Sequence, residues 1–233
     1  MRSSSPRRWR ARATVVLAMT AAATGCGEDS SSAGPATTFP TDFEAANCLV
    51  TLHGRSGDGA APRRHDGWAE LSPPANEAWE GGGRVWVYDT EDAYADARSA
   101  VTEVVDAAGC ERVVIHGFSN GAAFAGALAC RGEDLDGRLV GVVVDDPVPD
   151  DSSPRCAPAA GLGVAVYWTG GLREAEPGAS CEDLGWTCAG GDRLIGIDEY
   201  AERLGAVVQR SPHREHEAYR DAPEIAEWLR VGA

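Results

Sequence analysis

Short apolar runs recur along the chain, and most of them are continuous instead of alternating with polar residues. Residues 112–116 read RVVIH, and residues 139–144 read LVGVVV. Strands that are buried on both faces, as in a parallel sheet covered by helices, have this pattern. The strands predicted on this ground are Asn47–Leu52, Arg84–Tyr88, Arg112–His116, Leu139–Val144, Gly163–Trp168 and Ala206–Gln209.

Segments with helical spacing lie between these strands. In one of them, Ala97, Val101, Val104 and Ala108 fall on a single helical face. The order of strands and helices predicts an α/β fold with a doubly wound, mostly parallel sheet of about six strands. No insertion is long enough for a large cap domain. The predicted helices are Ala93–Ala108, Ala122–Cys130, Asp198–Leu204 and Pro223–Arg230.

One segment, Gly-Phe-Ser-Asn-Gly at residues 117–121, stands between an apolar strand and a helix of small residues. This context predicts a strand, a sharp turn and a helix, with Ser119 at the apex. Such a turn exposes the hydroxyl and directs it to the helix N-terminus, where N–H groups favour developing negative charge. We therefore predict that Ser119 is a nucleophile. The alternative is an ordinary turn in which the serine caps the helix.

A second segment supplies what a nucleophilic serine needs. The apolar strand Asn47–Leu52 ends in His53-Gly54 and opens into a glycine-rich loop. Acyl transfer passes through an oxyanion, which two backbone N–H donors must stabilise. A His-Gly turn supplies one donor, and the residue after the nucleophile supplies the other. We expect these donors to be the N–H groups of Arg55 and Asn120, unless the loop merely turns the chain.

The general base should be a histidine on the loop after the last strand, because that loop passes over the turn that carries the nucleophile. His213 and His216 both lie there. We choose His216, since it leads directly into the final helix, although a shift of one turn would reverse the choice. His53 and His116 are interpreted as structural residues.

The acid that orients the imidazole normally follows the strand before the last one. We choose Asp192, because it precedes the helix that leads to the final strand. Glu174 has a plausible distance from the end of the preceding strand, and Asp183 is another alternative. Asp145 and Asp146 also remain open; they end a buried strand and should need partners there.

Taken in chain order, the His-Gly turn, the G-x-S-x-G segment, an acid and a late histidine resemble the α/β-hydrolase superfamily. Gly-Phe-Ser-Asn-Gly-Ala resembles its short dienelactone-hydrolase and esterase or depolymerase branches. The resemblance covers about Asn47 to Leu229. It implies attack by Ser119 on an ester, thioester or amide carbonyl, with His216 as base and then acid. The chain departs from the family by lacking obvious first strands and by an insert, Leu172–Gly191, that carries two cysteines.

The N-terminus has the features of an export signal. A basic region with five arginines and no acid precedes an apolar stretch, residues 13–24. Ala-Thr-Gly-Cys at residues 23–26 then resembles a lipobox, with alanine where leucine is usual, so we predict lipidation of Cys26. The expected organisation is a signal peptide over residues 1–25, a flexible tether over 26–41 and a hydrolase domain over 42–233. An ordinary secretory signal is the alternative.

Charge and cysteine content narrow the expected partners. The formal net charge is −15, and removal of the signal would make it more negative. This excludes nucleic acid as a partner and leaves the lipid at Cys26 as the membrane attachment. Six further cysteines in an exported chain suggest disulfides, with Cys181 and Cys188 as the favoured local pair. No spacing resembles a zinc site, and we expect neither metal nor cofactor.

The sequence therefore predicts an exported, lipid-anchored serine hydrolase. We expect a monomer that cleaves a carboxylic ester, in a small molecule or a polymer, through a Ser-His-acid triad. The site is expected to lie on the extracytoplasmic side of the membrane. The alternative is a surface lipoprotein without catalytic activity that has kept the fold as a binding module.

Overall fold

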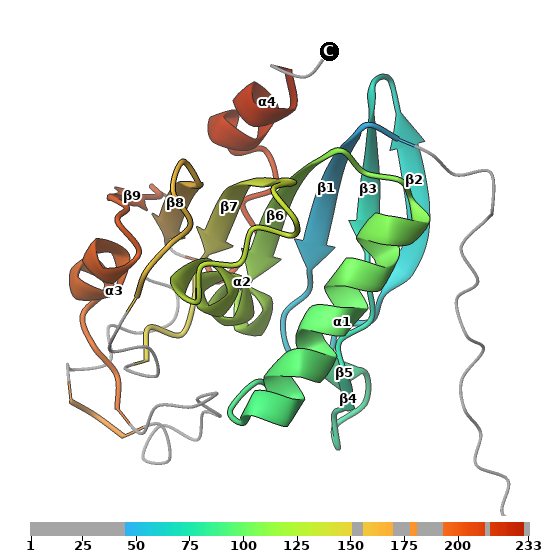
Figure 1. The fold of residues 1–233 in the computed structure, drawn as a ribbon. Coiled ribbons are helices and arrows are strands. Elements are labelled where there is room, and N and C mark those ends of the chain that lie inside the picture. Colours follow the sequence, from blue (N-terminus) through green and yellow to red (C-terminus); the bar gives the residue numbers. More distant parts are fainter. Residues whose placement is uncertain (1–44, 151–155, 170–177, 181–192, 213–214, 231–233) are drawn as a thin grey trace, which may run out of the picture. The chain divides into compact units, whose positions relative to one another are not determined.

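In the computed structural model, the described residues are 45–150, 156–169, 178–180, 193–212 and 215–230. A seven-stranded sheet runs through them in the order β2-β3-β1-β6-β7-β8-β9 (Figure 1). Every neighbouring pair is parallel except β2 and β3. The strands of this sheet are β1 (Asn47–Leu52), β2 (Ala60–His65), β3 (Trp68–Ser72), β6 (Arg112–Phe118), β7 (Leu139–Asp145), β8 (Gly163–Trp168) and β9 (Val208–Arg210).

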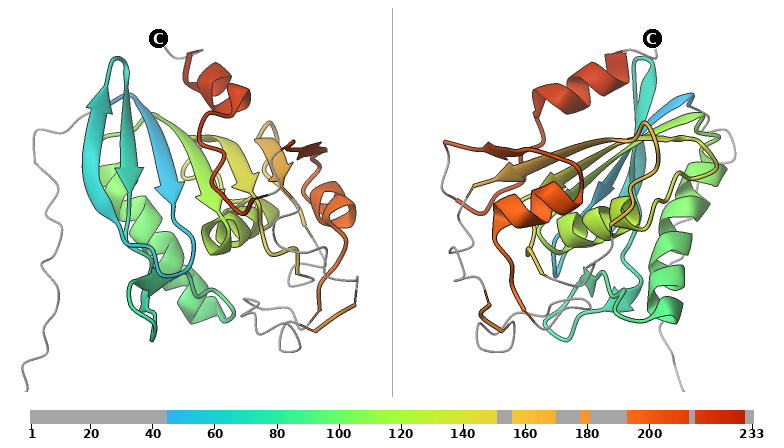
Figure 2. Two further views of the ribbon diagram at one scale, coloured as in Figure 1. Left: turned by 180° about the vertical axis from the view of Figure 1, so that it is seen from behind. Right: turned by 60° about the vertical axis from the view of Figure 1, so that its left-hand side comes forward.

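Helices cover both faces of the sheet (Figure 2). One face packs against α1, α2 and α3 and contains the larger apolar core. The other face packs against α4 and contains a smaller apolar cluster. The predicted doubly wound, mostly parallel architecture is confirmed. The helices are α1 (Glu91–Ala107), α2 (Asn120–Cys130), α3 (Ile197–Arg203) and α4 (Pro223–Arg230).

The prediction of a sheet strand over Arg84–Tyr88 is wrong. Only Arg84–Val85 is a strand (β5), and it pairs with β4 (Glu77–Ala78) outside the main sheet. Side chains bind the backbone that follows: the Trp86 N–H donates to Asn120 Oδ1 at 2.8 Å, and the Val87 N–H donates to Asn76 Oδ1 at 3.0 Å. Because these amides already have partners, no strand ladder is needed to satisfy them.

Two strands, β2 and β3, form where the sequence indicated only a long glycine- and proline-rich loop. In β3, Ala69 and Leu71 are buried while their neighbours are partly exposed, as in a strand with one covered face. β2 carries Arg63 and Arg64 on a largely exposed edge, where charged residues oppose pairing with other chains. β2 is polar and largely exposed, and β3 has only two buried apolar residues, so neither forms the continuous apolar run that marks the central strands.

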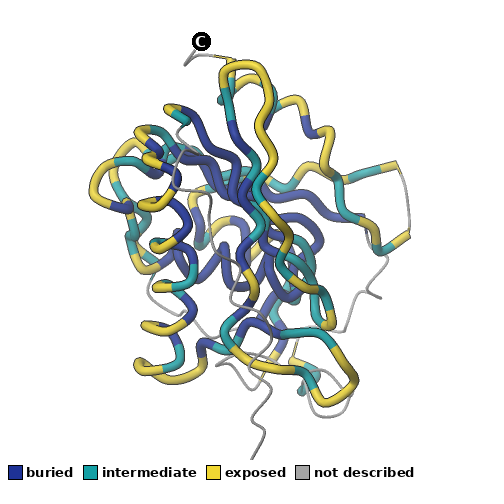
Figure 3. The backbone as a smooth tube through the Cα atoms, turned by 90° about the vertical axis from the view of Figure 1, so that its right-hand side faces the viewer, coloured by how far each residue is buried: buried dark blue, intermediate teal, exposed yellow. Residues whose placement is uncertain are grey.

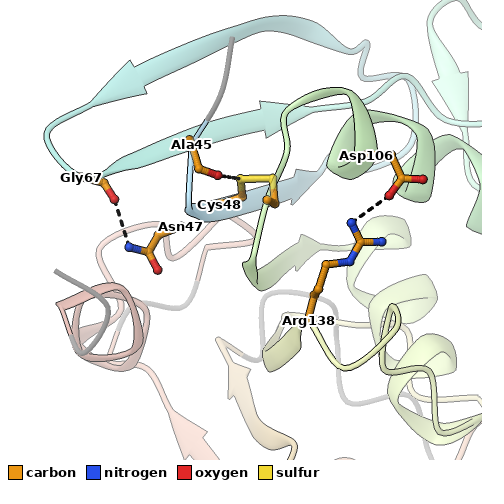
Figure 4. The surroundings of a disulfide bond; sticks show 7 residues. Ala45, Asn47, Cys48, Gly67, Asp106 and Arg138 are labelled. Carbon is orange, nitrogen blue, oxygen red and sulfur yellow. Dashed lines mark hydrogen bonds and ion pairs between the residues drawn. A yellow bond between two sulfur atoms is a disulfide. The ribbon is translucent and has the colours of Figure 1, made fainter.

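Two disulfides link strand β1 and helix α2 to loop residues. Cys48 of β1 pairs with Cys110, and Cys130 at the end of α2 pairs with Cys156 (Figure 4 shows the first). The expectation of disulfides is thus confirmed for four of the six cysteines. The favoured pair, Cys181 and Cys188, lies outside the described residues.

Helix α2 is buried along its whole length, and the central strands beside it are also buried (Figure 3). Its sequence, NGAAFAGALAC, has mostly small side chains, so the helix axis can approach β6 and β7 closely. Gly126 meets the Tyr200 hydroxyl of α3, which leaves no room for a side chain at that position. This packing fixes the N-terminus of α2, and with it Ser119.

Candidate active site

Ser119 lies between β6 and α2 in a backbone conformation that is rare for a residue with a side chain. Its φ is +55° and its ψ is −116°. Such a conformation is strained and persists only where the surrounding structure imposes it. A side chain at Gly117 would collide with the carbonyl of Gly121, and one at Gly121 would collide with the carbonyl of Leu52. The two glycines therefore permit the sharp turn, as the pattern predicted.

A continuous chain of hydrogen bonds leads from Ser119 into the protein. Its Oγ lies 2.9 Å from His216 Nε2, and His216 Nδ1 lies 2.6 Å from Asp146 Oδ2. The natural assignment is that the hydroxyl donates to Nε2 and the Nδ1–H donates to the carboxylate. The imidazole also packs on the Phe118 ring at a centroid distance of 4.7 Å. His216 is partly exposed, whereas Asp146 is fully buried.

Asp146 has several partners for its buried carboxylate. It accepts hydrogen bonds from the Thr169 N–H at 3.0 Å and from the Thr169 hydroxyl at 2.6 Å. Its own N–H donates to the Tyr167 carbonyl at 3.0 Å, which anchors the turn after β7 to β8. A buried carboxylate needs such donors because burial removes its hydration. Together with His216, these contacts fix the carboxylate in position.

The acid beside His216 is thus Asp146, one of the open alternatives, and it follows the strand before the one we expected. The chosen residue, Asp192, lies outside the described residues, as do Asp183 and Glu174. Since β7 and β8 are parallel neighbours, their C-terminal ends meet at one edge of the sheet, and an acid after either strand can approach the same histidine. The useful sequence signal was a pair of acids ending a continuous apolar strand.

The choice between the two histidines has a related outcome. His216 lies beside Ser119, as predicted. His213, the alternative, lies outside the described residues. The loop after β9 therefore brings an imidazole to the turn that carries the serine, as the chain order indicated.

The two predicted N–H donors belong to segments that adjoin the serine. A Cβ built on Gly54 would be 3.2 Å from the Ser119 Cβ, so Arg55 follows a residue in contact with the nucleophile. The Gly57 N–H donates to the Gly54 carbonyl at 3.1 Å, which closes the turn around Arg55. Asn120 is the first residue of α2, so its N–H has no acceptor within the helix.

The Asn120 side chain has a different task. Its Oδ1 accepts from the Trp86 N–H at 2.8 Å, and its Nδ2 donates to the Trp86 carbonyl at 3.1 Å. Both ends of the amide therefore bind the Trp86 backbone, in the segment after β5. This pair of bonds holds the start of α2 while leaving its backbone N–H available.

His53 supports the turn that contains Arg55. Its Nδ1 lies 2.8 Å from the Gly54 carbonyl, and its Nε2 lies 3.3 Å from the Ala75 backbone N. The first contact requires a donor on Nδ1 and the second an acceptor at Nε2, so the geometry selects the neutral ring. Burial also lowers the pKa of His53, against a smaller raising effect from the Gly54 carbonyl. The structural role predicted for His53 agrees with these contacts.

Three of the described tryptophans lie in different parts of the fold. Trp79, in the β4–β5 hairpin, packs under the Arg55 guanidinium at 4.7 Å from the ring centroid. Trp68 stacks on His65 at a centroid distance of 3.9 Å, in the β2–β3 hairpin. Trp168 is buried at the end of β8. Only Trp79 among these three adjoins the turn next to the serine.

Among the described residues, no group of three or more His, Cys, Asp or Glu side chains is placed to hold a metal ion. Within the same part of the chain, no helix combines the length and the apolar character needed to cross a membrane.

The fold is similar to solved structures of esterases. A carboxylesterase from Mesorhizobium loti is 19% identical at a TM-score of 0.52, and the match covers 81% of this chain and 90% of that one. Esterase PE8 is 15% identical at a TM-score of 0.53, covering 84% of this chain and 97% of that one. No family model and no curated protein matches the sequence. At such low identity the likeness establishes a common fold, that of the α/β-hydrolases.

Proposed function

We propose that the protein is a serine hydrolase that cleaves a carboxylic ester, with Ser119 as nucleophile, His216 as base and Asp146 as the orienting acid. The observation that carries this proposal is the hydrogen-bonded chain Ser119–His216–Asp146, which begins at a strained turn. The names of two structural neighbours, a carboxylesterase and an esterase, agree with this reaction type.

The geometry supports a two-step acyl transfer. Ser119 Oγ attacks the ester carbonyl while its proton passes to His216 Nε2, and the tetrahedral oxyanion is stabilised by the N–H groups of Arg55 and Asn120. His216 then gives the proton to the leaving alcohol, and the carbon–oxygen bond of the ester breaks. Water then attacks the acyl carbonyl while one of its protons passes to His216 Nε2. The imidazolium gives this proton to Ser119 Oγ as the bond between Oγ and the acyl carbon breaks, which releases the carboxylic acid and free Ser119.

Asp146 makes this proton transfer possible in two ways. Its bond to Nδ1–H fixes the tautomer in which Nε2 is a free acceptor for the serine hydroxyl. Its negative charge also stabilises the imidazolium that forms during attack. Because the carboxylate is held by Thr169 as well, the imidazole needs little reorganisation during the reaction.

Hydrolysis of a p-nitrophenyl ester tests this proposal. We expect turnover by the purified protein and a loss of about 10⁴-fold or more in kcat for Ser119→Ala, the scale on which serine hydrolases depend on their nucleophile. Thr51→Ala is a matched control, because it also removes a hydroxyl but one with no role in the proposed reaction. The partly buried Thr51 hydroxyl is hydrogen-bonded to Ser72 Oγ, on the neighbouring strand, at 2.5 Å. Equal activity in Ser119→Ala and the wild type would contradict the proposal.

We also propose export and attachment to the extracytoplasmic face of a membrane through a lipid on Cys26. The basic and apolar N-terminal residues and the Ala-Thr-Gly-Cys sequence support this. The enzyme would then act there as a monomer, on a small or polymeric ester, and the negative net charge disfavours nucleic acid as a partner.

Expression with a radiolabelled fatty acid tests the anchor. Cys26→Ser should lose the label and leave the membrane fraction; an unlabelled wild type would refute the anchor.

A further inference from the structure

A second His–Asp pair lies directly behind the first. His116 Nε2 is 2.9 Å from Asp145 Oδ2, and the two side chains are 4% and 0% exposed. In the register of β6 and β7, Phe118 is opposite Asp145, so alternation puts the His116 and Asp145 side chains on the same face. This is the face covered by α4, as the apolar cluster containing Val114 and Val143 shows.

The same carboxylate oxygen also binds the segment that carries the base. Asp145 Oδ2 accepts a hydrogen bond from the Tyr219 N–H, three residues after His216. The Tyr219 ring stacks on Tyr167 at a centroid distance of 5.1 Å. One oxygen therefore connects β6, which leads to the nucleophile, with the loop that holds the imidazole.

This connection matters because residues 215–222, which include His216, form neither helix nor strand. The imidazole ring itself contacts Ser119, Asp146 and the Phe118 ring, which all precede it in the sequence. Downstream of His216, the Asp145–Tyr219 bond fixes the loop backbone to the sheet. Misplacement of a reacting group by about 1 Å can cost about 100-fold in rate.

We propose that Asp145, held by His116, is a positioning residue that sets the place of the His216 segment relative to Ser119. The proposal rests on the proposed function, since it assigns a task in that reaction. Consecutive carboxylates thereby divide the work: Asp146 orients the imidazole ring, and Asp145 orients the backbone that carries it. This role requires an acceptor oxygen at the position of Oδ2, and it does not require a negative charge on residue 145.

This last point gives a sharp pair of variants. Among the described residues, Asp145 Oδ1 is buried and has no hydrogen-bond partner. In Asp145→Asn the amide oxygen can take the place of Oδ2 and keep both bonds, while the amide nitrogen replaces the unpartnered oxygen. Asp145→Ala removes both bonds. Positioning therefore predicts that asparagine rescues what alanine loses.

The experiment measures kcat and KM for p-nitrophenyl acetate together with thermal unfolding. For Asp145→Ala we expect a fall in kcat of about 100-fold with KM changed less than about threefold, and for Asp145→Asn a kcat within about threefold of the wild type. Asp150→Ala is the matched control, because Asp150 is also buried, four residues after Asp146, but lines a separate small cavity with Cys156 and Tyr200. It should lose thermal stability without losing kcat.

Unchanged kcat in Asp145→Ala, or an equal loss in the asparagine variant, would overturn the proposal. Proton NMR supplies a readout that does not need activity or the alanine variant. The downfield His216 Nδ1–H signal, assigned by its loss in His216→Ala, should persist in Asp145→Asn. The Tyr219 amide proton should keep the chemical shift of a hydrogen-bonded N–H in the same variant. Loss of both signals in that variant would contradict positioning by geometry. A wild type with these signals but no esterase activity would instead refute the proposed reaction alone.

Discussion

At the scale of the residue, the position of Asp146 determines what the site can do. Its carboxylate is buried and accepts hydrogen bonds from the backbone N–H and the hydroxyl of Thr169. Its Oδ2 also lies within hydrogen-bond distance of His216 Nδ1. Asp145, the preceding residue, is hydrogen-bonded to a different histidine, His116, and to the backbone N–H of Tyr219. Adjacent and chemically identical side chains thus have separate roles, because the strand ends between them and the backbone turns at Asp146, where φ is +53°.

The assignment of the acid can be tested by exchanging each candidate for its neutral amide. We expect Asp146→Asn to lower kcat by about 10⁴-fold, because the amide cannot hold the required tautomer of His216. Asp192→Asn should stay within about threefold of the wild type, because the proposed mechanism gives this carboxylate no role. Steady-state ester hydrolysis by both variants decides this. A larger loss in the Asp192 variant would return the role to the residue chosen from sequence.

His53 makes the stability of the folded chain depend on pH. Burial lowers its pKa in the folded state, so the folded protein binds a proton less readily than the unfolded chain. The stabilising contribution is complete above the unfolded pKa of about 6.5 and is lost as the pH falls through the lowered folded value. Urea unfolding at about pH 7.5 and at about pH 5 measures this effect. His53→Gln should show a smaller difference between the two conditions; an undiminished difference would contradict the assignment.

At the scale of the element, the turn from β6 to α2 depends on glycines that leave room for the backbone. Gly121→Ala would place a methyl group against the Leu52 carbonyl, so we expect a loss of about 1–3 kcal/mol in the free energy of unfolding and a large loss of activity. Gly196→Ala, at the start of α3, meets no atom within 4 Å and should change stability by less than about 0.5 kcal/mol. Denaturant unfolding of both variants compares them. Equal stability would show that the turn is not crowded.

The disulfide between Cys48 and Cys110 closes a loop with a sequence separation of 62 residues, from β1 to the start of β6. Replacing both cysteines by alanine should lower the free energy of unfolding by about 2–4 kcal/mol, mainly by releasing the unfolded chain. The site lies at the opposite ends of these strands, so kcat of the folded fraction should be preserved. Denaturant unfolding and ester hydrolysis measure the two quantities. A loss of kcat with unchanged stability would contradict this separation.

Sequence reasoning succeeded for elements with strong local signals. The apolar runs identified β1, β6, β7 and β8, and helical spacing identified α1, because long buried segments leave clear patterns. It failed at β2 and β3, which lack a continuous apolar run. It also failed at Arg84–Tyr88, where the side chains of Asn76 and Asn120 bind the backbone N–H groups. Such side-chain partners depend on tertiary structure and leave no periodic signal.

At the scale of the whole molecule, the sheet brings together residues that lie far apart in sequence. Ser119 and His216 are separated by 97 positions, and His216 and Asp146 by 70. Parallel neighbours place the C-terminal ends of β1, β6 and β7 at one edge, where the His-Gly turn, the serine and the acid meet (Figure 1). The G-x-S-x-G segment and the chain order indicated the serine and the histidine that the structure brings within 2.9 Å of each other. It could not select the acid, because two adjacent strands end at the same place.

The central claim is that Ser119 is an activated nucleophile, and fluorophosphonate labelling followed by peptide mass spectrometry tests it most directly. The account predicts one covalent adduct, on the peptide that contains Ser119. The adduct should form much more slowly in His216→Ala and be absent in Ser119→Ala. A wild type that is not labelled, or a Ser119→Ala variant labelled to the same extent as the wild type, would contradict the account.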